Sequence, residues 1–383
     1  MMLLLGMHNA SVYPYQSLIA IERIGLSKPA FSLMLVMASA IAVTSSVLFG
    51  ILGDQHGHRR RIALGTACAS SLGIAVMLIH PGPWALILCQ GILLPLASSI
   101  YGQLFALARL AHPDEGRTRD GTLANIRSAM SVSFLATLIF WTFAFAMGAN
   151  VMAVYLTGGL ASLAMSLLVV FKWPRDGQTT WADQRSGLNL SQAFRDIATP
   201  HILLRLVAIG ALSSAGNLYM VLISLVFEAS PLRGAGDVAL YVGLVAGFEV
   251  PAMLILPRIA RRLPRSTMIA LGALIYTSHL IALPFLVDTP YLWLMTIIAG
   301  VGGVAIITLP IPYYQDLLAG RPGTAAAMLA LQKLVSDVLS AAAFALGTAL
   351  GGFETVAIIG TTTALTGALT LYLADRRTAL ATA

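Results

Sequence analysis

Charged residues are scarce in this chain: they make up 10% of its 383 residues, whereas hydrophobic residues make up 58%. A soluble globular domain carries roughly 25% charged residues. So few charges cannot cover a surface that faces water, and most of the surface must therefore face lipid. The composition excludes an ordinary soluble protein.

Cysteine is almost absent as well. Cys68 and Cys89 both lie in apolar runs, which favours small packing residues over a disulfide framework or a metal site. The seven histidines are scattered, without the spacing of metal ligands. The sequence contains no glycine-rich phosphate loop that ends in Lys-Ser or Lys-Thr, no nucleophile elbow and no zinc-protease motif. We therefore expect no cofactor, no metal and no enzymatic activity.

What the sequence does contain is a series of apolar runs long enough to cross a bilayer. They predict an all-α membrane protein with twelve transmembrane helices in two six-helix bundles. The predicted helices are 2–21, 30–52, 62–80, 84–108, 122–146, 150–171, 201–228, 238–257, 266–287, 291–317, 324–348 and 353–374. The long polar stretch at 173–199 is predicted to be a cytoplasmic linker. It joins an N-terminal half, 1–172, to a C-terminal half, 200–383, which ends in a short cytoplasmic tail.

A weak internal repeat supports two pseudo-symmetric halves. The loop from Gly53 to Arg61 has a counterpart from Pro257 to Arg265, at an offset of 204 residues. The dipeptide Gly116-Arg117 has a counterpart in Gly320-Arg321 at the same offset. Several matches at one offset indicate a duplicated six-helix unit.

The distribution of Lys and Arg predicts the orientation. If both termini and the linker lie on one side, 17 of the 23 Lys and Arg residues lie there too. Because basic loops stay in the cytoplasm, we expect both termini to be cytoplasmic in a multi-pass protein of a bacterial inner membrane. The same bias accounts for the net charge of +7 without a nucleic-acid partner.

A basic loop joins the second and third predicted helices and reads Gly50-Ile-Leu-Gly-Asp54-Gln-His-Gly57-His-Arg59-Arg60-Arg61. It resembles the signature of the major facilitator superfamily, G-x-x-x-D-R/K-x-G-x-R/K-R/K, with Gln55 in place of a basic residue. The resemblance implies a cytoplasmic latch, or gate, that involves Asp54, Gly57, Arg59 and Arg60. Alternatively, the arginines only fix the topology. Asp316 and Arg321, after the tenth predicted helix, are also candidates for a gate or for topology.

Most of the chain is also similar to the sugar efflux transporter branch of that superfamily. The similar stretches are Gln103 to Arg109, Glu249-Val-Pro251-Ala-Met and Gln315 to Gly323. The resemblance implies the major facilitator fold and export of sugars, or of sugar analogues, coupled to an ion gradient. Asn217, Tyr219 and Arg127 fall where that branch carries polar groups.

Glu249, Lys333 and Asp337 lie within the predicted spans, where a charge must face a cavity or a partner. Glu249, near the middle of its helix, is the candidate for proton coupling; alternatively, it is fixed to a donor on a neighbouring helix. Lys333 and Asp337 are four residues apart and share one helix face. They form either an ion pair that substrate opens or a pair that only neutralises itself.

Other polar side chains are candidates for substrate contacts. Tyr13 and Gln16 flank Pro14, which predicts a break in the middle of the first helix, and they supply an aromatic ring and an amide, both suited to a sugar. Arg127 either contacts substrate or extends to the cytoplasmic interface. Asn217 either binds sugar hydroxyls or makes an interhelical hydrogen bond.

Together, these patterns predict a monomeric secondary active transporter that exports a small molecule, expected to be a sugar, by alternating access in exchange for protons. A multidrug or metabolite efflux antiporter of the same superfamily is the alternative. A membrane enzyme would need clustered His, Asp or Glu at one membrane face, and a sensor would need a soluble domain. The sequence shows neither.

Overall fold

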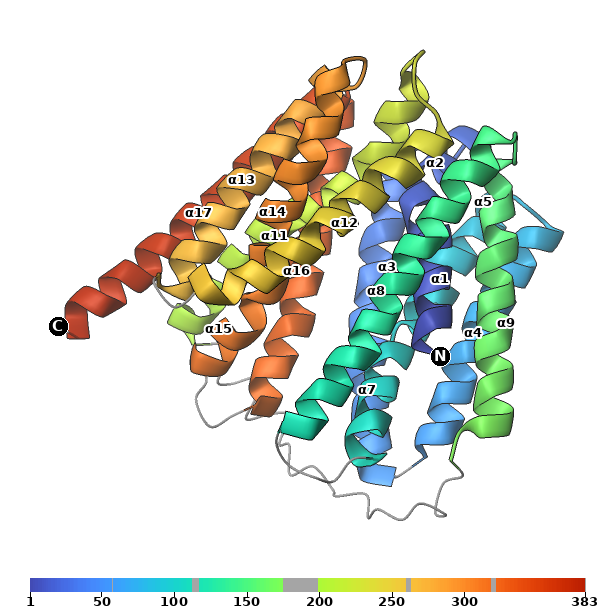
Figure 1. The fold of residues 1–383 in the computed structure, drawn as a ribbon, viewed down its shortest axis with the longest axis horizontal. Coiled ribbons are helices and arrows are strands. Elements are labelled where there is room, and N and C mark those ends of the chain that lie inside the picture. Colours follow the sequence, from blue (N-terminus) through green and yellow to red (C-terminus); the bar gives the residue numbers. More distant parts are fainter. Residues whose placement is uncertain (57, 112–116, 175–198, 260–262, 318–321, 383) are drawn as a thin grey trace. The chain divides into compact units, whose positions relative to one another are not determined.

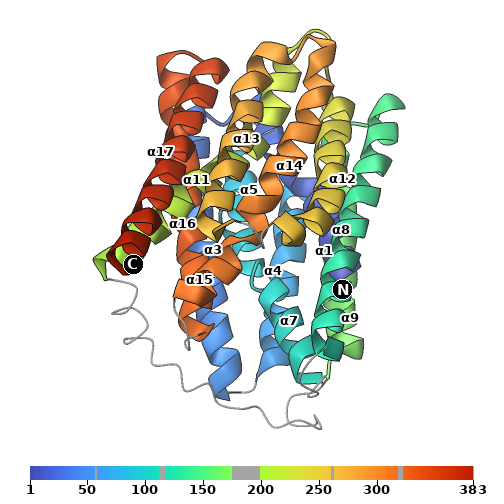
Figure 2. The ribbon, with the colours of Figure 1, turned by 60° about the vertical axis from the view of Figure 1, so that its left-hand side comes forward.

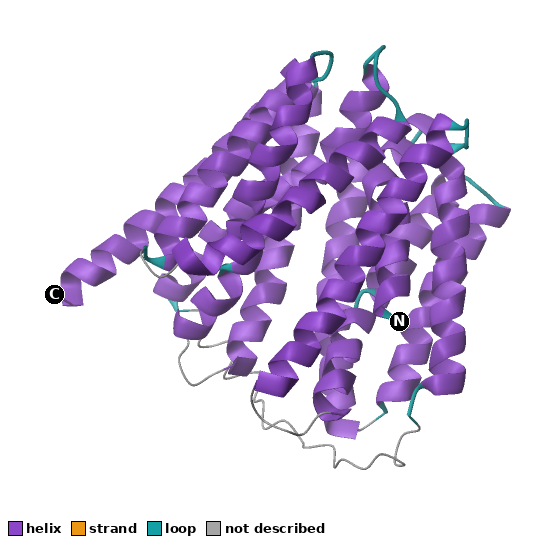
Figure 3. Ribbon diagram, viewed as in Figure 1, coloured by secondary structure: helices purple, strands orange, loops and turns teal. Residues whose placement is uncertain are grey.

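The described chain consists of helices joined by short turns (Figures 1 and 3). The computed structural model describes residues 1–56, 58–111, 117–174, 199–259, 263–317 and 322–382. Within these ranges there is no strand, and 11 segments are long and apolar enough to cross a membrane. This confirms the predicted all-α, multi-pass architecture.

The chain divides into two compact units. Figure 2 gives a second view of their helices. The first unit holds Met1–Ser27 and Met37–Gly187, and the second holds Lys28–Val36 and Leu188–Ala383. Residues 175–198 of the predicted linker lie outside the described residues. The boundaries of the halves therefore remain a prediction.

The first unit contains helices of very different lengths. In chain order these are α1 (Met2–Val12), η1 (Tyr13–Tyr15), α2 (Gln16–Leu18), η2 (Ile19–Arg23), α3 (Lys28–His56), α4 (Arg59–Ile79), α5 (Pro83–Leu86), η3 (Ile87–Leu93), α6 (Leu94–Ala97), α7 (Ile100–Ala111), α8 (Arg117–Ala146), η4 (Val151–Ala153) and α9 (Val154–Lys172). The start of α3, Lys28–Val36, belongs to the second unit. The helix α1 packs against α8 and α9, and α4 also packs against α9.

Buried hydrogen bonds join these helices. Nδ1 of His8 in α1 lies 3.0 Å from Oγ of Ser162 in α9, and that hydroxyl lies 2.8 Å from Oγ of Ser70 in α4. Nε1 of Trp141 in α8 donates to Oγ of Ser11 at 3.2 Å. Lipid tails are as apolar as leucine, so close packing and such interhelical hydrogen bonds drive helix association in a bilayer.

The second unit is built around α11. Its elements are α11 (Pro200–Ala229), α12 (Ala235–Ile259), α13 (Arg265–Leu286), η5 (Pro290–Trp293), α14 (Leu294–Thr308), α15 (Pro310–Leu317), α16 (Pro322–Leu350) and α17 (Phe353–Thr382). The helix α11 packs against α16 and α17, α13 packs against α14 and α17, and α12 packs against α14.

Glycines in α14 allow its neighbours to approach closely. A Cβ atom on Gly302 would lie 2.6 Å from the backbone nitrogen of Tyr276 in α13. A Cβ atom on Gly300 would lie 2.7 Å from Cβ of Phe248 in α12. No larger side chain fits at either position unless the helices move apart. The glycines therefore bring α12 and α13 directly onto α14.

Three of the predicted helices are interrupted. The first gives way to a short 3-10 turn at Tyr13–Tyr15, and the fourth contains a π-helical segment at Ile87–Leu93 followed by Pro95. The tenth is divided at Leu309, between α14 and α15. A proline follows or lies within each interruption, and because it lacks a backbone N–H it cannot continue the regular ladder of hydrogen bonds. Hydrophobic length predicts the spans but not these interruptions.

Candidate functional site

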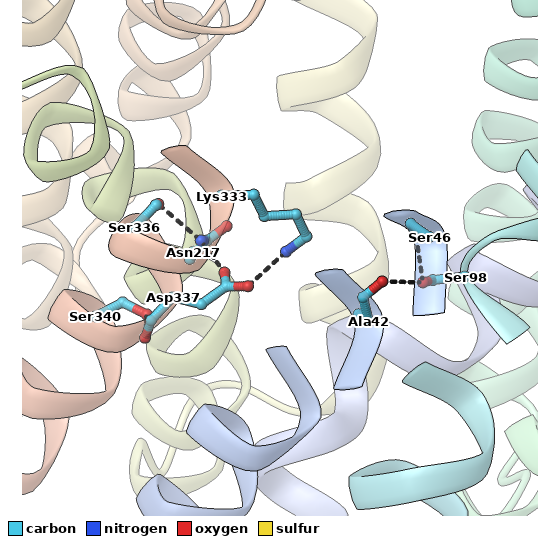
Figure 4. Close-up of polar contacts among 8 residues, drawn as sticks. All are labelled: Ala42, Ser46, Ser98, Asn217, Lys333, Ser336, Asp337 and Ser340. Carbon is cyan, nitrogen blue, oxygen red and sulfur yellow. Dashed lines mark hydrogen bonds and ion pairs between the residues drawn. The ribbon is translucent and has the colours of Figure 1, made fainter. Parts of the chain in front are cut away.

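A group of polar side chains lies between α11 and α16 of the second unit (Figure 4). We call Asn217, Lys333, Ser336 and Asp337 the Asn217 cluster. The amide of Asn217 donates to Oγ of Ser336 at 2.9 Å and to the carboxylate of Asp337. Nζ of Lys333 donates to the other carboxylate oxygen of Asp337 at 2.7 Å. The carboxylate is therefore shared between an amide of one helix and an ammonium of another.

Helical spacing explains why these side chains meet. Lys333, Ser336 and Asp337 follow the i, i+3, i+4 pattern that aligns side chains along one helix face. The side chain of Lys333 is 59% exposed, whereas that of Asp337 is 14% exposed. The ammonium group of Lys333 is therefore exposed, whereas the carboxylate of Asp337 is largely buried. A second contact between the same helices, from Nε2 of Gln332 to Oγ of Ser213 at 3.0 Å, lies beside the cluster.

The cluster can both donate and accept hydrogen bonds at one place. An amide supplies both functions, a carboxylate only accepts and an ammonium only donates. The sequence predicts contacts to solute for Asn217, Lys333 and Asp337, and the structure brings all three together. It also shows the interhelical hydrogen bond and the intrahelical ion pair that were their alternatives. These contacts occupy the same groups that a hydroxyl-bearing solute would use.

Glu249 lies apart from this cluster, on α12. Its Oε1 is 3.4 Å from the position that a Cβ of Gly303 would occupy in α14. The ring of Tyr276 in α13 lies 3.3 Å from the same position. Glycine at 303 therefore leaves room for the carboxyl group between three helices. Its neighbours here are an aromatic ring and a glycine backbone, not a basic side chain.

Tyr219 does not join the Asn217 cluster. It follows Asn217 by two residues, so about 200° of helical rotation separates the two side chains on α11. Tyr219 is 3% exposed, and its ring packs against those of Tyr241, Tyr276 and His279. The structure places it on the Tyr276 side of the unit, where Glu249 also lies.

In the first unit, the interruption of the first helix exposes one of the predicted contacts. The side chain of Tyr13 is 40% exposed at the 3-10 turn, and Gln16 is half-buried at the next turn. Oγ atoms of Ser46 in α3 and Ser98 lie 3.4 Å apart at an exposed position (Figure 4). Sequence reasoning missed this hydroxyl pair, although the nearby Pro95 signals an irregular helix.

The predicted gating residues are described only in part. Nη2 of Arg60 donates to the backbone carbonyl of Val170 at 2.7 Å, close to the carboxyl end of α9, where a positive charge is favourable. Asp316 is ion-paired with Arg265 at the start of α13. Arg59 is half-buried in the first turn of α4. The side chains of Asp54, Arg127 and Arg321, and the residue Gly57, lie outside the described residues.

A buried ion pair in the second unit escaped sequence analysis. Nε of Arg205 in α11 lies 2.8 Å from Oδ1 of Asp375 in α17, and the hydroxyl of Tyr313 in α15 donates to the same oxygen at 2.9 Å. Two further guanidinium nitrogens of Arg205 donate to the backbone carbonyls of His201 and Ala374. The sequence places Arg205 in a helix but gives no hint of a partner 170 residues away.

Comparison with known proteins identifies relatives over most of the chain. The sequence profile of the Major Facilitator Superfamily matches residues 1–344. The chain is 25% identical over 349 residues to a Deinococcus radiodurans protein named for sugar efflux, covering 88% of this chain and 87% of that protein. It is 25% identical over 320 residues to sugar efflux transporter C of Escherichia coli, covering 78% of this chain and 76% of the relative.

Solved structures share the fold. The nucleoside transporter NupG superposes with a TM-score of 0.78 at 14% identity, over 98% of this chain and 97% of that one. The peptide transporter POT, solved in complex with sulfate, gives 0.77 at 12% identity, over 98% and 93%. At such identities the likeness shows the fold alone. The family match and the fold agree that the chain is a member of the major facilitator superfamily, and thus a membrane transporter rather than an enzyme.

Proposed function

We propose that this transporter exports sugars, or sugar-like small solutes, by alternating access and in exchange for protons. The observation that carries the proposal is the Asn217 cluster, which places an amide, a carboxylate and an ammonium together between two spanning helices. The names of its relatives in Deinococcus radiodurans and Escherichia coli, which refer to sugar efflux, support the same substrate class.

A neutral polyol suits this cluster for a chemical reason. A sugar hydroxyl donates one hydrogen bond and accepts others, so neighbouring hydroxyls can bind the carboxylate of Asp337 and the ammonium of Lys333 together. The two charges already neutralise each other across 2.7 Å, so the cluster requires no charge on the solute. In this proposal, sugar replaces part of the existing contacts of Asn217 and Lys333. Tyr13 and Gln16 of the first unit remain substrate contacts predicted from the sequence alone.

A lipophilic cation suits the cluster less well. Such a solute needs an accessible carboxylate, but here the exposed charge is the ammonium of Lys333, while Asp337 is 14% exposed. The positive group would repel the cation at close range. We therefore favour sugar efflux over the drug-efflux alternative.

Proton coupling is assigned to Glu249. A carboxyl group near the middle of a spanning helix must face a cavity or a partner, and Glu249 lies beside the ring of Tyr276 and the backbone of Gly303. We propose that it binds a proton from the outside and releases it to the cytoplasm. We further propose that the protein is a monomer in the inner membrane and that both of its termini are cytoplasmic.

The test is solute uptake into inside-out membrane vesicles with an acidic interior. Radiolabelled glucose and lactose should accumulate, and a protonophore should abolish accumulation. Asn217→Leu should reduce uptake, whereas Thr362→Val should not, because the Thr362 hydroxyl bonds only within an exposed turn of α17. If neither sugar accumulates in vesicles that contain correctly inserted protein, and ethidium does, the drug-efflux alternative replaces this proposal.

A further inference from the structure

Among the buried polar atoms of the second unit that make no hydrogen bond within the described residues, four belong to side chains whose rings contact one another. They are the hydroxyls of Tyr219 and Tyr241 and both ring nitrogens of His279. His279 and Tyr241 are 0% exposed, and Tyr219 is 3% exposed. We call these residues, together with Tyr276, the His279 cluster. The His279 cluster does not include any residue of the Asn217 cluster, and the function proposed above does not use it.

The rings of this cluster surround His279. Its ring centroid lies 5.0 Å from that of Tyr219, 5.3 Å from that of Tyr276 and 6.0 Å from that of Tyr241. The four residues come from α11, α12 and α13. Their rings touch, but the polar atoms of Tyr219, Tyr241 and His279 do not pair with one another.

The chemistry of these atoms indicates what they bind. A buried polar group is costly unless it is hydrogen-bonded, and four such groups in one place form a polar site. The neutral imidazole needs one acceptor and one donor, and each hydroxyl can give and take a hydrogen bond. Water supplies both functions in the smallest volume. Next to Tyr276, a Cβ built on Gly216 would meet no atom closer than the hydroxyl of Tyr276, 3.9 Å away, so a group of that size fits beside this hydroxyl.

The first unit offers a contrasting histidine. His8 is also buried, at 5% exposure, but its Nδ1 contacts Oγ of Ser162 at 3.0 Å and the carbonyl of Gly158 at 3.2 Å. A buried histidine in this chain is therefore not generally left without partners. Unlike Nδ1 of His8, neither ring nitrogen of His279 makes a side-chain hydrogen bond within the described residues.

The His279 cluster lies between Glu249 and one end of the second unit. Tyr276 contacts both His279 and the pocket of Glu249. Tyr241 precedes Glu249 on α12 by eight residues, or about 12 Å of helix. Its ring lies 6.1 Å from Trp293, over which the guanidinium of Arg233 lies. Arg233 also donates to the carbonyl of Val287, in the turn that follows α13. The cluster thus leads from Glu249 towards the loops that join α11 to α12 and α13 to η5.

We propose that the His279 cluster binds buried water and that this water connects Glu249 with that loop end for proton transfer. One ring nitrogen of His279 accepts a proton from water while the other ring nitrogen releases its proton, so the ring stays neutral. The released proton passes through water to the carboxylate of Glu249. The water site stands on the geometry alone. Its use in coupling rests on the function proposed above.

The water site is tested by solid-state NMR on the full chain in liposomes, with ring-¹⁵N histidine. The ring-nitrogen signals of His279 are assigned by their loss in His279→Gln. Magnetisation from water should reach these nitrogens at mixing times at which no magnetisation reaches the ring nitrogens of His8. Tyr241→Phe, which keeps the ring, should weaken that transfer, and Thr277→Val should not, because its hydroxyl already bonds to the carbonyl of Ala273. A His279 signal no stronger than that of His8 would overturn the site.

The proton route has a separate test that needs no substrate. The infrared band of the protonated Glu249 carboxyl, assigned by its loss in Glu249→Gln, is followed after transfer into D₂O. Exchange should slow several-fold in His279→Gln and in Tyr241→Phe and stay unchanged in Thr277→Val. Unchanged exchange in the first two variants would refute the route. Failure of sugar transport in vesicles bears on neither experiment, so the two proposals fail independently.

Discussion

Replacing Asp375 by alanine should destabilise the second unit by about 3 kcal/mol, because it leaves a buried guanidinium without its counter-charge. The side chain of Arg205 is 6% exposed, and its Nε lies 2.8 Å from Asp375. Breaking such a pair costs about 3–5 kcal/mol. We take the lower end, because Asp375 is 26% exposed and Arg205 keeps its bonds to the carbonyls of His201 and Ala374.

The assay is the fraction of purified protein that stays monodisperse by size-exclusion chromatography after heating. At roughly 2–4 °C per kcal/mol, the midpoint for Asp375→Ala should fall by about 6–12 °C. The matched control is Asp316→Ala, which breaks the exposed pair with Arg265, in which the side chains are 67% and 38% exposed. Exposed pairs contribute about 0–1 kcal/mol, so this midpoint should move little.

Two further variants separate charge from contact. Asp375→Asn keeps an acceptor for the Tyr313 hydroxyl and should lose less stability than alanine. Arg205→Met combined with Asp375→Leu removes both charges and should recover much of the loss, since a buried pair can be replaced by apolar residues at little cost. Equal midpoints for Asp375→Ala and Asp316→Ala would refute the reasoning.

Three other predictions concern transport and packing. Asn217→Leu removes the amide proposed to bind a neutral sugar hydroxyl, a hydrogen bond worth about 0.5–1.5 kcal/mol, so KM for sugar uptake should rise about two- to tenfold; an unchanged KM would remove Asn217 from the binding site. Glu249→Gln should abolish gradient-driven accumulation but leave sugar counterflow, and persistent accumulation would exclude Glu249 as the proton carrier. Gly302→Ala should cost about 1–3 kcal/mol in the heating assay because its Cβ meets α13, whereas Gly247→Ala, with no atom within 4 Å, should be neutral. Similar midpoints for the two glycine variants would contradict the packing argument.

The fold was predictable because a bilayer imposes one length on every spanning helix. Apolar runs therefore give the helices directly, and basic loops give an expected orientation. Pro14 predicted a break in the middle of the first helix, but the interruption at Leu309 was not predicted. A proline inside a spanning helix is tolerated or breaks the helix according to which neighbours satisfy the released backbone groups. That information lies in the packing.

The candidate site was predictable only where its contacts are local. Lys333 and Asp337 are four residues apart, so their pairing follows from helix geometry. The contact from Asn217 to Asp337 spans 120 residues, and whether Asn217 or Tyr219 faces α16 depends on the rotation of α11 against its neighbours. His279 looks like any scattered histidine in the sequence. Only the structure shows that three tyrosine rings surround it and that its ring nitrogens make no side-chain hydrogen bond within the described residues.

The division of the tenth helix has a mechanical consequence. Pro310 and Pro312 have no N–H, so the carbonyls of Ile306 and Thr308 have no donor four residues later. Bending between α14 and α15 therefore breaks no backbone hydrogen bond at these two positions. Side chains of α15 also join it to other helices: Tyr313 bonds to Asp375 of α17, and Asp316 pairs with Arg265 of α13. Backbone bonds from Leu309 to Ala305 and from Tyr313 to Leu309 still cross the junction, so a reduced hydrogen-bond ladder, and not a complete one, connects α14 to α15.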